Sequence, residues 1–362
     1  MLDGVRIIEI EGLGPGPFAG LMLADLGADV IVVHRETPPL SQDAGSSLID
    51  RGKRSIVLDL KQEDGLATLR KLAATADGLI EGFRPGVMER LGLGPDALHA
   101  QNPRLVYGRI TGWGQSGPKA SEAGHDLNYI GLSGALHYAS MPGTPPFTPP
   151  TLVGDIGGGA MYLVAGMLAG LLRAARTGQG TVVDAAIVDG SAHMMNLLMA
   201  ARSTGIFGLD RGTSILDGAP WSRCYETSDG GWLSVQCIEP QFYAEFLDKL
   251  GTAGDPDLAQ TPDRAAWPAM AARFAAIVAT KDLADWTAVF ADSDACVAPV
   301  LDPAAAARDP HIAARGTWVE VDSRLQARAA PRFDGERPGD PASPPERGEH
   351  TAEILASLDS SQ

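Results

Sequence analysis

Cysteine is scarce in this chain: only Cys224, Cys237 and Cys296 occur among its 362 residues. Their spacing is typical neither of a disulfide framework nor of a zinc site. A disulfide-stapled scaffold is therefore excluded. Because unpaired thiols are usual in a reducing compartment, we expect a cytoplasmic protein.

The sequence also lacks an export signal and a long hydrophobic run. Residues 1–6 have no basic start followed by an apolar stretch, so they do not resemble a signal peptide. The best candidate for a membrane span covers 17 residues, 156–172, which is the short limit for such a span. Because this run is rich in glycine and alanine, we predict a buried helix there and no membrane partner.

Positive charge is in deficit. The chain has 29 Lys and Arg residues against 45 Asp and Glu, which gives a net charge of −16. This balance argues against a nucleic-acid partner, because binding to a phosphate backbone relies on clustered cations. The deficit is uneven, however: residues 1–120 carry 13 basic and 15 acidic side chains, and the remainder carries 16 and 30. The N-terminal third could therefore bind a small polyanion.

The first 115 residues alternate between strand patterns and helix patterns. We predict strands at 5–10, 29–33, 55–60, 78–81 and 105–110, and helices at 18–26 and 62–76. Alternation of this kind indicates an α/β fold with a parallel, doubly wound sheet.

The remainder of the chain is predicted to continue this domain and then to form another. Further helices are expected at 158–176 and 188–202, with a strand at 181–184 between them. The composition changes near residue 215, and residues 215–300 indicate a separate, smaller α+β domain.

A glycine- and proline-rich turn at 12–17 follows the first predicted strand. A dinucleotide site is disfavoured there, because Pro15 and Pro17 remove two N–H donors that a pyrophosphate would need. In addition, the second strand ends in His34 and Arg35 rather than in an acidic residue. We interpret the turn as a place where the backbone closely approaches a ligand or another strand.

Five cations lie at or near the ends of predicted strands: Arg35, Lys53, Arg54, Lys61 and Arg84. Ligands of open α/β sheets bind at strand ends, and phosphate recognition needs several fixed cations. These residues alone leave two interpretations open, a phosphate site and an ordinary solvated surface.

The candidate catalytic pair consists of two titratable residues next to glycines. His125 lies between Gly124 and Asp126, and Asp155 follows Gly154 in a glycine-rich segment. An imidazole and a carboxylate presented in this way could remove a proton from one face of a carbon and return it to the other.

Each of these residues also has a structural interpretation. A lone histidine is more often a hydrogen-bonding residue of the scaffold than a catalyst, and Asp126 could orient His125 or cap a helix starting near Leu127. Asp155 could be the N-cap of a helix that the following glycines open; such a helix end can also stabilise an oxyanion. Glu239 lies between a predicted strand and helix, where capping is a strong alternative to catalysis.

Together these residues resemble CoA-transferase family III, the CaiB/BaiF superfamily, and within it the α-methylacyl-CoA racemases. The resemblance extends over nearly the whole chain and rests on motifs in a fixed order. The motifs are residues 11–17, 26–30, 81–87, 111–118, 124–129, 154–155, 183–190, 238–243, 294–297 and 348–351.

The resemblance implies a domain scheme. A large Rossmann-like domain at 1–190 would be completed by about 325–362, and a small α+β domain would occupy 215–300. A linker helix at 191–214 and a return linker at 301–324 would join them. Two chains would interlock as a homodimer, with a site between the large domain of one and the small domain of the other. The CoA phosphates would lie on the large domain, near Arg35, Lys53, Arg54, Lys61 and Arg84.

The resemblance also implies two alternative reactions. In CoA transferases, the aspartate that matches Asp155 attacks a thioester and forms an acyl anhydride, whereas the racemases have both the histidine and the aspartate. His125 and Asp155 would then invert the 2-methyl centre of an acyl-CoA thioester through an enolate. No metal or organic cofactor would be needed, since CoA is part of the substrate. Glu239 would assist across the dimer interface, and Asp126 would orient His125.

The chain departs from the racemase pattern at two places near the expected pocket. Thr151 stands where asparagine is common, and Trp221 and Ser222 stand where paired aromatics are common. The acyl preference is therefore left open. A cluster of Met194, Met195 and Met199 could line an adaptable acyl surface or belong to the ordinary core.

Overall fold

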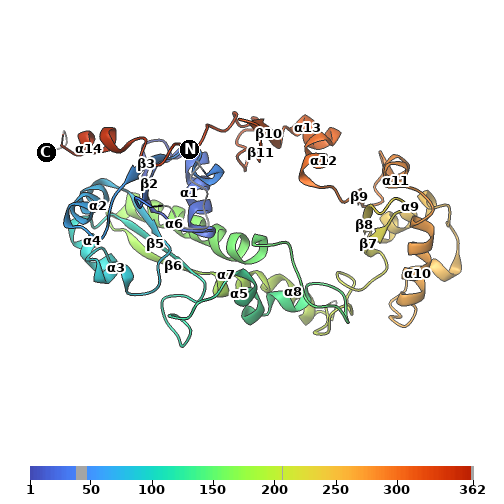
Figure 1. Ribbon diagram of the computed structural model, residues 1–362. Helices are drawn as coiled ribbons and strands as arrows, with labels where there is room; N and C mark the ends of the chain where they lie inside the picture. Colours follow the sequence, from blue (N-terminus) through green and yellow to red (C-terminus); the bar gives the residue numbers. More distant parts are fainter. Residues whose placement is uncertain (38–46, 206, 360–362) are drawn as a thin grey trace. The chain divides into compact units, whose positions relative to one another are not determined.

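The computed structural model describes residues 1–37, 47–205 and 207–359. The chain divides into two compact units. The first unit comprises Met1–Ala135, Pro149–Met194 and Ala307–Gln362, and the second comprises Leu136–Thr148 and Met195–Ala306. Each unit has its own hydrophobic core and is described separately (Figure 1).

The first unit is built on a six-stranded parallel sheet, in the order β3-β2-β1-β4-β5-β6. The strands are β1 (Arg6–Ile10), β2 (Asp29–His34), β3 (Arg54–Val57), β4 (Gly78–Glu81), β5 (Val106–Thr111) and β6 (Thr181–Ala186). The predicted parallel α/β sheet is therefore confirmed. The strand order reverses between β1 and β4, and in open parallel sheets this position is where ligands bind.

Helices cover both faces of this sheet. Successive strand residues point to opposite sides, and the side chains on each side are buried in a core of their own. Ile8 of β1 packs in one core with Leu69, whereas its neighbour Ile7 packs in the other core with Leu163. The helices of this unit are α1 (Pro15–Asp25), α2 (Glu63–Thr75), α3 (Val87–Arg90), α4 (Pro95–Gln101), α5 (Asp126–Ser133), α6 (Met161–Thr177), α7 (Ile187–Met194), α13 (Pro310–Arg315) and α14 (Thr351–Asp359). A hairpin of β10 (Trp318–Val321) and β11 (Arg324–Ala327) precedes α14.

The helix predicted at 158–176 begins earlier and in a different form. A π-helix spans Leu152–Ala160 and continues directly into α6. By length and composition alone, Leu152–Thr177 could cross a membrane, but buried core helices share those properties. Leu163, Val164 and Met167 of α6 are buried in the core beside the sheet, as predicted for this apolar run.

The second unit contains an antiparallel three-stranded sheet in the order β7-β8-β9. Its elements are α8 (Asn196–Ser203), β7 (Ser222–Glu226), β8 (Trp232–Gln236), α9 (Pro240–Lys249), α10 (Trp267–Val278), α11 (Leu283–Phe290) and β9 (Val297–Pro299), and α12 (Pro303–Arg308) lies at its end. Aromatic side chains, among them Trp221, Phe246, Phe274 and Trp286, form its core. The long helix predicted at 188–202 is in fact two helices, α7 and α8, that are interrupted at Met195.

Candidate active site

Asp155 lies within the π-helix, in its first turn and not at its cap. The alternative interpretation of Asp155 as an N-cap is therefore wrong, because Thr151 occupies that position. π-helical segments are rare and occur frequently at functional sites. The glycines of this segment allow close packing: a Cβ on Gly158 would lie only 2.7 Å from the backbone nitrogen of Ser191 in α7.

Asp126 connects the two candidate catalytic residues. It is the first residue of α5, is only 7% exposed, and its Oδ1 accepts a hydrogen bond from the Asp155 backbone N–H at 2.9 Å. Gly154 must be glycine here, since a Cβ would overlap this carboxylate. Asp126 thus fixes the backbone of Asp155. The cap of α5 is His125 and not Asp126, and the predicted role of Asp126 in orienting His125 stays a prediction.

His125 is the N-cap residue of α5 and is exposed. Its backbone N–H donates to the Asn128 side chain at 3.0 Å, which holds the start of the helix. Burial, and then the charge of Asp126, raise the pKa of Asp155 from 3.8 to about 6, while His125 opposes this rise. The structure therefore brings His125 and Asp155 within electrostatic range of each other. A carboxyl group with a pKa near 6 can accept and donate protons close to neutral pH.

The glycine-rich turn at 12–17 packs against Asp155. Gly14 has a φ of 68°, and a Cβ on it would lie 3.4 Å from Asp155 Oδ2. Pro15 begins α1 directly after this turn. The expected close backbone approach is therefore made to the side chain of Asp155.

Tyr129 supports the same site, although sequence reasoning did not single it out. Its hydroxyl donates to the carbonyl of Gly124, the residue before His125, and its ring packs edge-on against Trp113 with centroids 4.7 Å apart. A Cβ on Gly112 would overlap the Tyr129 ring. The signal in the sequence is this pairing of aromatic residues with glycines, which a single sequence does not distinguish from ordinary packing.

Electrostatics connect Tyr129 to both sides of the site. Burial and the Asp155 carboxylate raise the pKa of its phenol, and the charge of Arg84 opposes them. Arg84 is exposed and follows β4 in the loop that leads to α3. The candidate pair and one of the five predicted cations thus lie in the same neighbourhood.

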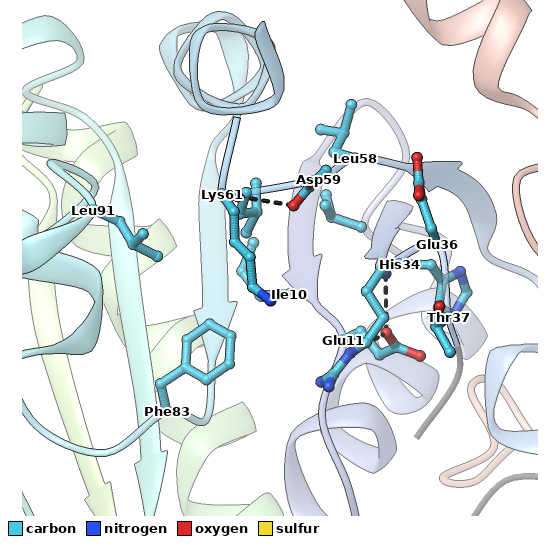
Figure 2. A pocket seen from close by; sticks show the side chains of 13 residues that line it. Ile10, Glu11, His34, Glu36, Thr37, Leu58, Asp59, Lys61, Phe83 and Leu91 are labelled. Carbon is cyan, nitrogen blue, oxygen red and sulfur yellow. Dashed lines mark hydrogen bonds and ion pairs between the residues drawn. The ribbon is translucent and has the colours of Figure 1, made fainter. Parts of the chain in front are cut away.

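A cavity of about 460 Å³ opens at the carboxyl ends of β1, β2 and β4. Figure 2 shows Phe83 and Leu91 on one side of it, and Glu11 and His34 on the other. Its lining residues are Ile10, Glu11, Val33, His34, Arg35, Glu36, Thr37, Leu58, Asp59, Leu60, Lys61, Phe83 and Leu91. This mixture of an apolar floor and a charged rim suits a ligand with a flat ring and anionic groups. It includes the position at which the strand order reverses.

Comparison with known proteins identifies the family of the chain. The model of CoA-transferase family III matches residues 2–351. The chain belongs to CoA-transferase family III. The resemblance inferred from the ordered motifs is therefore confirmed.

Two curated relatives are similar to this family III chain over its whole length. The alpha-methylacyl-CoA racemase of Mus musculus is 41% identical over 366 residues, covering 100% of this chain and 94% of its own. The alpha-methylacyl-CoA racemase of Homo sapiens is 41% identical over 361 residues, covering 98% and 92%. Among solved structures, a CAIB/BAIF family protein from Brucella suis superposes with a TM-score of 0.84 at 29% identity, covering 99% of both chains.

Among the cations predicted to bind phosphates in this family III protein, Arg35 and Lys61 line the cavity. Arg35 follows β2 and keeps 53% of its side chain exposed. Lys61 is exposed and lies just before α2. Their contact with a ligand phosphate stays a prediction.

Lys53 has a different position from the predicted one. Its side chain is fully buried and forms an ion pair with Glu9 at 2.8 Å and another with Asp50 at 3.2 Å. It also donates to the carbonyl of Pro17 at 3.1 Å. An ammonium group enclosed by two carboxylates and a carbonyl is a structural cation, and it is not accessible to a phosphate.

Arg54 also differs from the expectation, because it begins β3 and so lies at the amino end of that strand. The cavity opens at the opposite, carboxyl edge. The Arg54 guanidinium is held by Asp29 through two hydrogen bonds of 2.8 and 2.6 Å, and by Glu353 of α14 at 3.1 Å. Its role is to attach the C-terminal helix to the sheet.

Glu239 belongs to the second unit and is the exposed N-cap residue of α9, with no capping hydrogen bond from its side chain. The absence of that bond weakens the capping interpretation. Its charge acts on Cys296, which has a φ of 53°, and after burial it is the largest contribution that raises the pKa of this thiol. The predicted role of Glu239 beside the catalytic pair stays a prediction.

The two departures from the racemase pattern have distinct structural positions. Thr151 precedes the π-helix in the left-handed region, with a φ of 62° that a β-branched residue rarely adopts. Trp221 is only 2% exposed and belongs to the core of the second unit, next to the buried Ser222. Met194 is 38% exposed and packs against Gly157 of the π-helix. Gly157 follows Asp155 by two residues in the sequence.

Proposed function

We propose that this protein is a racemase that inverts the 2-methyl stereocentre of 2-methylacyl-CoA thioesters. The observation that carries the proposal is the pairing of His125 with Asp155, whose pKa is raised to about 6, in a chain 41% identical to two alpha-methylacyl-CoA racemases. A racemase needs two groups that exchange protons near neutral pH, and both are present here.

In the proposed reaction, one of the two residues removes the proton from Cα of the thioester. The electron pair of the broken C–H bond moves into the carbonyl, which becomes an enolate oxygen. The other residue then delivers a proton to the opposite face of Cα, and the carbonyl re-forms. The roles of His125 and Asp155 exchange when the other stereoisomer reacts, so no net proton is gained or lost.

The CoA portion would occupy the cavity at the carboxyl edge of the sheet. Its apolar floor suits the adenine ring, while Arg35 and Lys61 at the rim suit the phosphates. Arg84 would act nearer the thioester, since its charge reaches Tyr129 beside the catalytic pair. No metal or further cofactor is required, because the thioester carbonyl itself accepts the developing charge. We also propose a homodimer in which Glu239 of the partner subunit assists the pair.

A CoA transferase that uses Asp155 as its nucleophile is the alternative reaction. Membership of CoA-transferase family III agrees with it only coarsely. An anhydride mechanism gives no role to an imidazole, whereas here His125 lies within electrostatic range of Asp155.

The two reactions are separated by incubating a 2-methylacyl-CoA in D₂O, with and without an acceptor acid. A racemase incorporates deuterium at Cα and inverts the centre without an acceptor. A transferase moves CoA to the acceptor, and hydroxylamine traps an acyl group on Asp155. The second result, without inversion, would replace our proposal with the transferase.

A further inference from the structure

The C-terminal segment reaches the rim of the cavity through Arg347. Its Nη2 donates to Glu11 Oε1 at 2.7 Å, and its Nη1 donates to the backbone carbonyl of Arg35 at 2.9 Å. The segment is anchored next to β3, where the Gly348 N–H donates to Ser55 Oγ at 2.8 Å. Arg347 is thereby held beside two cavity residues that are more than 300 positions away in sequence.

Glu11 joins the two arginines. Its Oε2 accepts from both the backbone N–H and the Nε of Arg35, each at 3.0 Å, while its Oε1 accepts from Arg347. The side chain is only 5% exposed. Burial alone would raise the pKa of Glu11, but the hydrogen bonds from Arg347 and from the Arg35 backbone lower it below its ordinary value. The Glu11 carboxylate therefore remains ionised and binds both Arg35 and Arg347 through charge-assisted hydrogen bonds.

Arg35 is consequently fixed before any ligand arrives. The backbone N–H and the Nε of Arg35 both donate to Glu11, which Figure 2 shows at the side of the cavity. About half of the Arg35 side chain stays exposed at the cavity. A long cationic side chain normally loses considerable freedom when it binds a phosphate, and fixing it in advance reduces that loss.

We propose that Arg347 is a positioning residue for the nucleotide end of the CoA thioester, acting through Glu11 and the Arg35 backbone to hold the Arg35 guanidinium at the cavity rim. This inference rests on the proposed function for the identity of the ligand. It assigns the C-terminal segment a part in ligand affinity and none in the proton transfer.

The test compares two substrates in the Arg347→Met variant. With a 2-methylacyl-CoA, we expect KM to rise about tenfold with kcat within about twofold, the effect of losing one charge-assisted bond. With the same acyl group on pantetheine, which lacks the nucleotide, we expect the KM of the variant to equal that of the wild type. A merely structural role would affect both substrates alike.

Arg328→Met is the matched control. Arg328 also lies in the C-terminal part of the chain and donates to a carboxylate, that of Asp340, and to two backbone carbonyls, but it does not line the cavity. We expect it to leave both KM values unchanged.

Equal increases for both substrates, an unchanged KM for the CoA thioester, or a loss confined to kcat would overturn the inference.

Should Arg347→Met fail to fold, Glu11→Gln and Arg347→Lys give the same test. Glu11→Gln should raise KM only for the CoA thioester, and Arg347→Lys should give a smaller rise. Calorimetry with free CoA keeps this result distinct from the proposed reaction, because Arg347→Met should weaken CoA binding even if no racemisation were found. Equal affinities of the wild type and Arg347→Met for CoA would refute the positioning role of Arg347.

Discussion

The sharpest prediction concerns Asp126, whose charge acts on the carboxyl group of Asp155. In Asp126→Asn, the amide oxygen can still accept the hydrogen bond from the Asp155 N–H, so the backbone geometry is retained. Only the negative charge is lost, and that charge contributes to the rise of the Asp155 pKa from 3.8 to about 6. We therefore expect the pKa of Asp155 to fall.

The magnitude follows from the order of the contributions. Burial is the largest of them and Asp126 the second, so removing the Asp126 charge should lower the pKa by roughly one unit. At pH 5 the ionised fraction of Asp155 would then rise from about 10% to about 50%, roughly a fivefold change. The low-pH limb of the kcat/KM profile should therefore move to lower pH by roughly one unit.

The assay is the pH profile of kcat/KM for each diastereomer of a 2-methylacyl-CoA, between pH 4.5 and 9. Both productive forms of the pair carry one proton in total, so the two diastereomers should share one bell-shaped profile. Relative to its own maximum, Asp126→Asn should be about fivefold more active than the wild type at pH 5. Asp184→Asn is a control, since Asp184 also accepts a backbone N–H, that of Gln115. A low-pH limb that stays in place or moves to higher pH refutes the reasoning.

Two further predictions test the scaffold. Lys53→Met should lower the free energy of unfolding by about 3 kcal/mol, because it leaves Glu9 buried without its partner. Burial raises the pKa of Glu9 from 4.5 to about 7 even though Lys53 opposes this rise, so loss of Lys53 should raise the pKa further. Because the folded variant then binds a proton at Glu9 that the unfolded chain releases above its ordinary pKa, stability should fall as the pH rises from about 4.5 through the raised folded-state pKa. Chemical denaturation at pH 5.5 and 8 measures this; a variant of normal stability with a raised KM for the CoA thioester would instead favour the phosphate role. Gly112→Ala should cost about 1–3 kcal/mol and lower kcat, because a Cβ there displaces the Tyr129 ring that bonds the residue before His125. Gly339→Ala, where a Cβ meets nothing within 4 Å, should do neither, and equal thermal shifts in the two variants would contradict the proposed packing.

The sequence predicted well what depends on local pattern. Runs of β-branched residues identified the parallel strands, since strands covered by helices on both faces are apolar throughout. The glycines around residues 124 and 154 indicated the two titratable side chains, and the structure brings His125 and Asp155 within electrostatic range.

The sequence did not predict what depends on distant partners. Lys53 and Lys61 flank the same predicted strand, at 55–60, yet Lys53 is enclosed by Glu9 and Asp50 while Lys61 is exposed. That difference arises from tertiary contacts, which no local pattern encodes. The same reason explains why the sequence predicts this helix only from residue 158, whereas a π-helix already begins at Leu152 and includes Asp155. This segment packs closely against α7, where Gly158 lies against the backbone of Ser191.

The most direct test of the two-base account is Cα–H exchange in D₂O, followed separately for the (2R) and (2S) diastereomers. We predict that His125→Ala and Asp155→Ala each lose inversion by at least about a hundredfold, the usual loss when one acid/base group is removed. Each variant should retain exchange with only one diastereomer, and the two variants should retain opposite ones. Inversion at the wild-type rate in either variant, or exchange of the same diastereomer by both, would contradict the account.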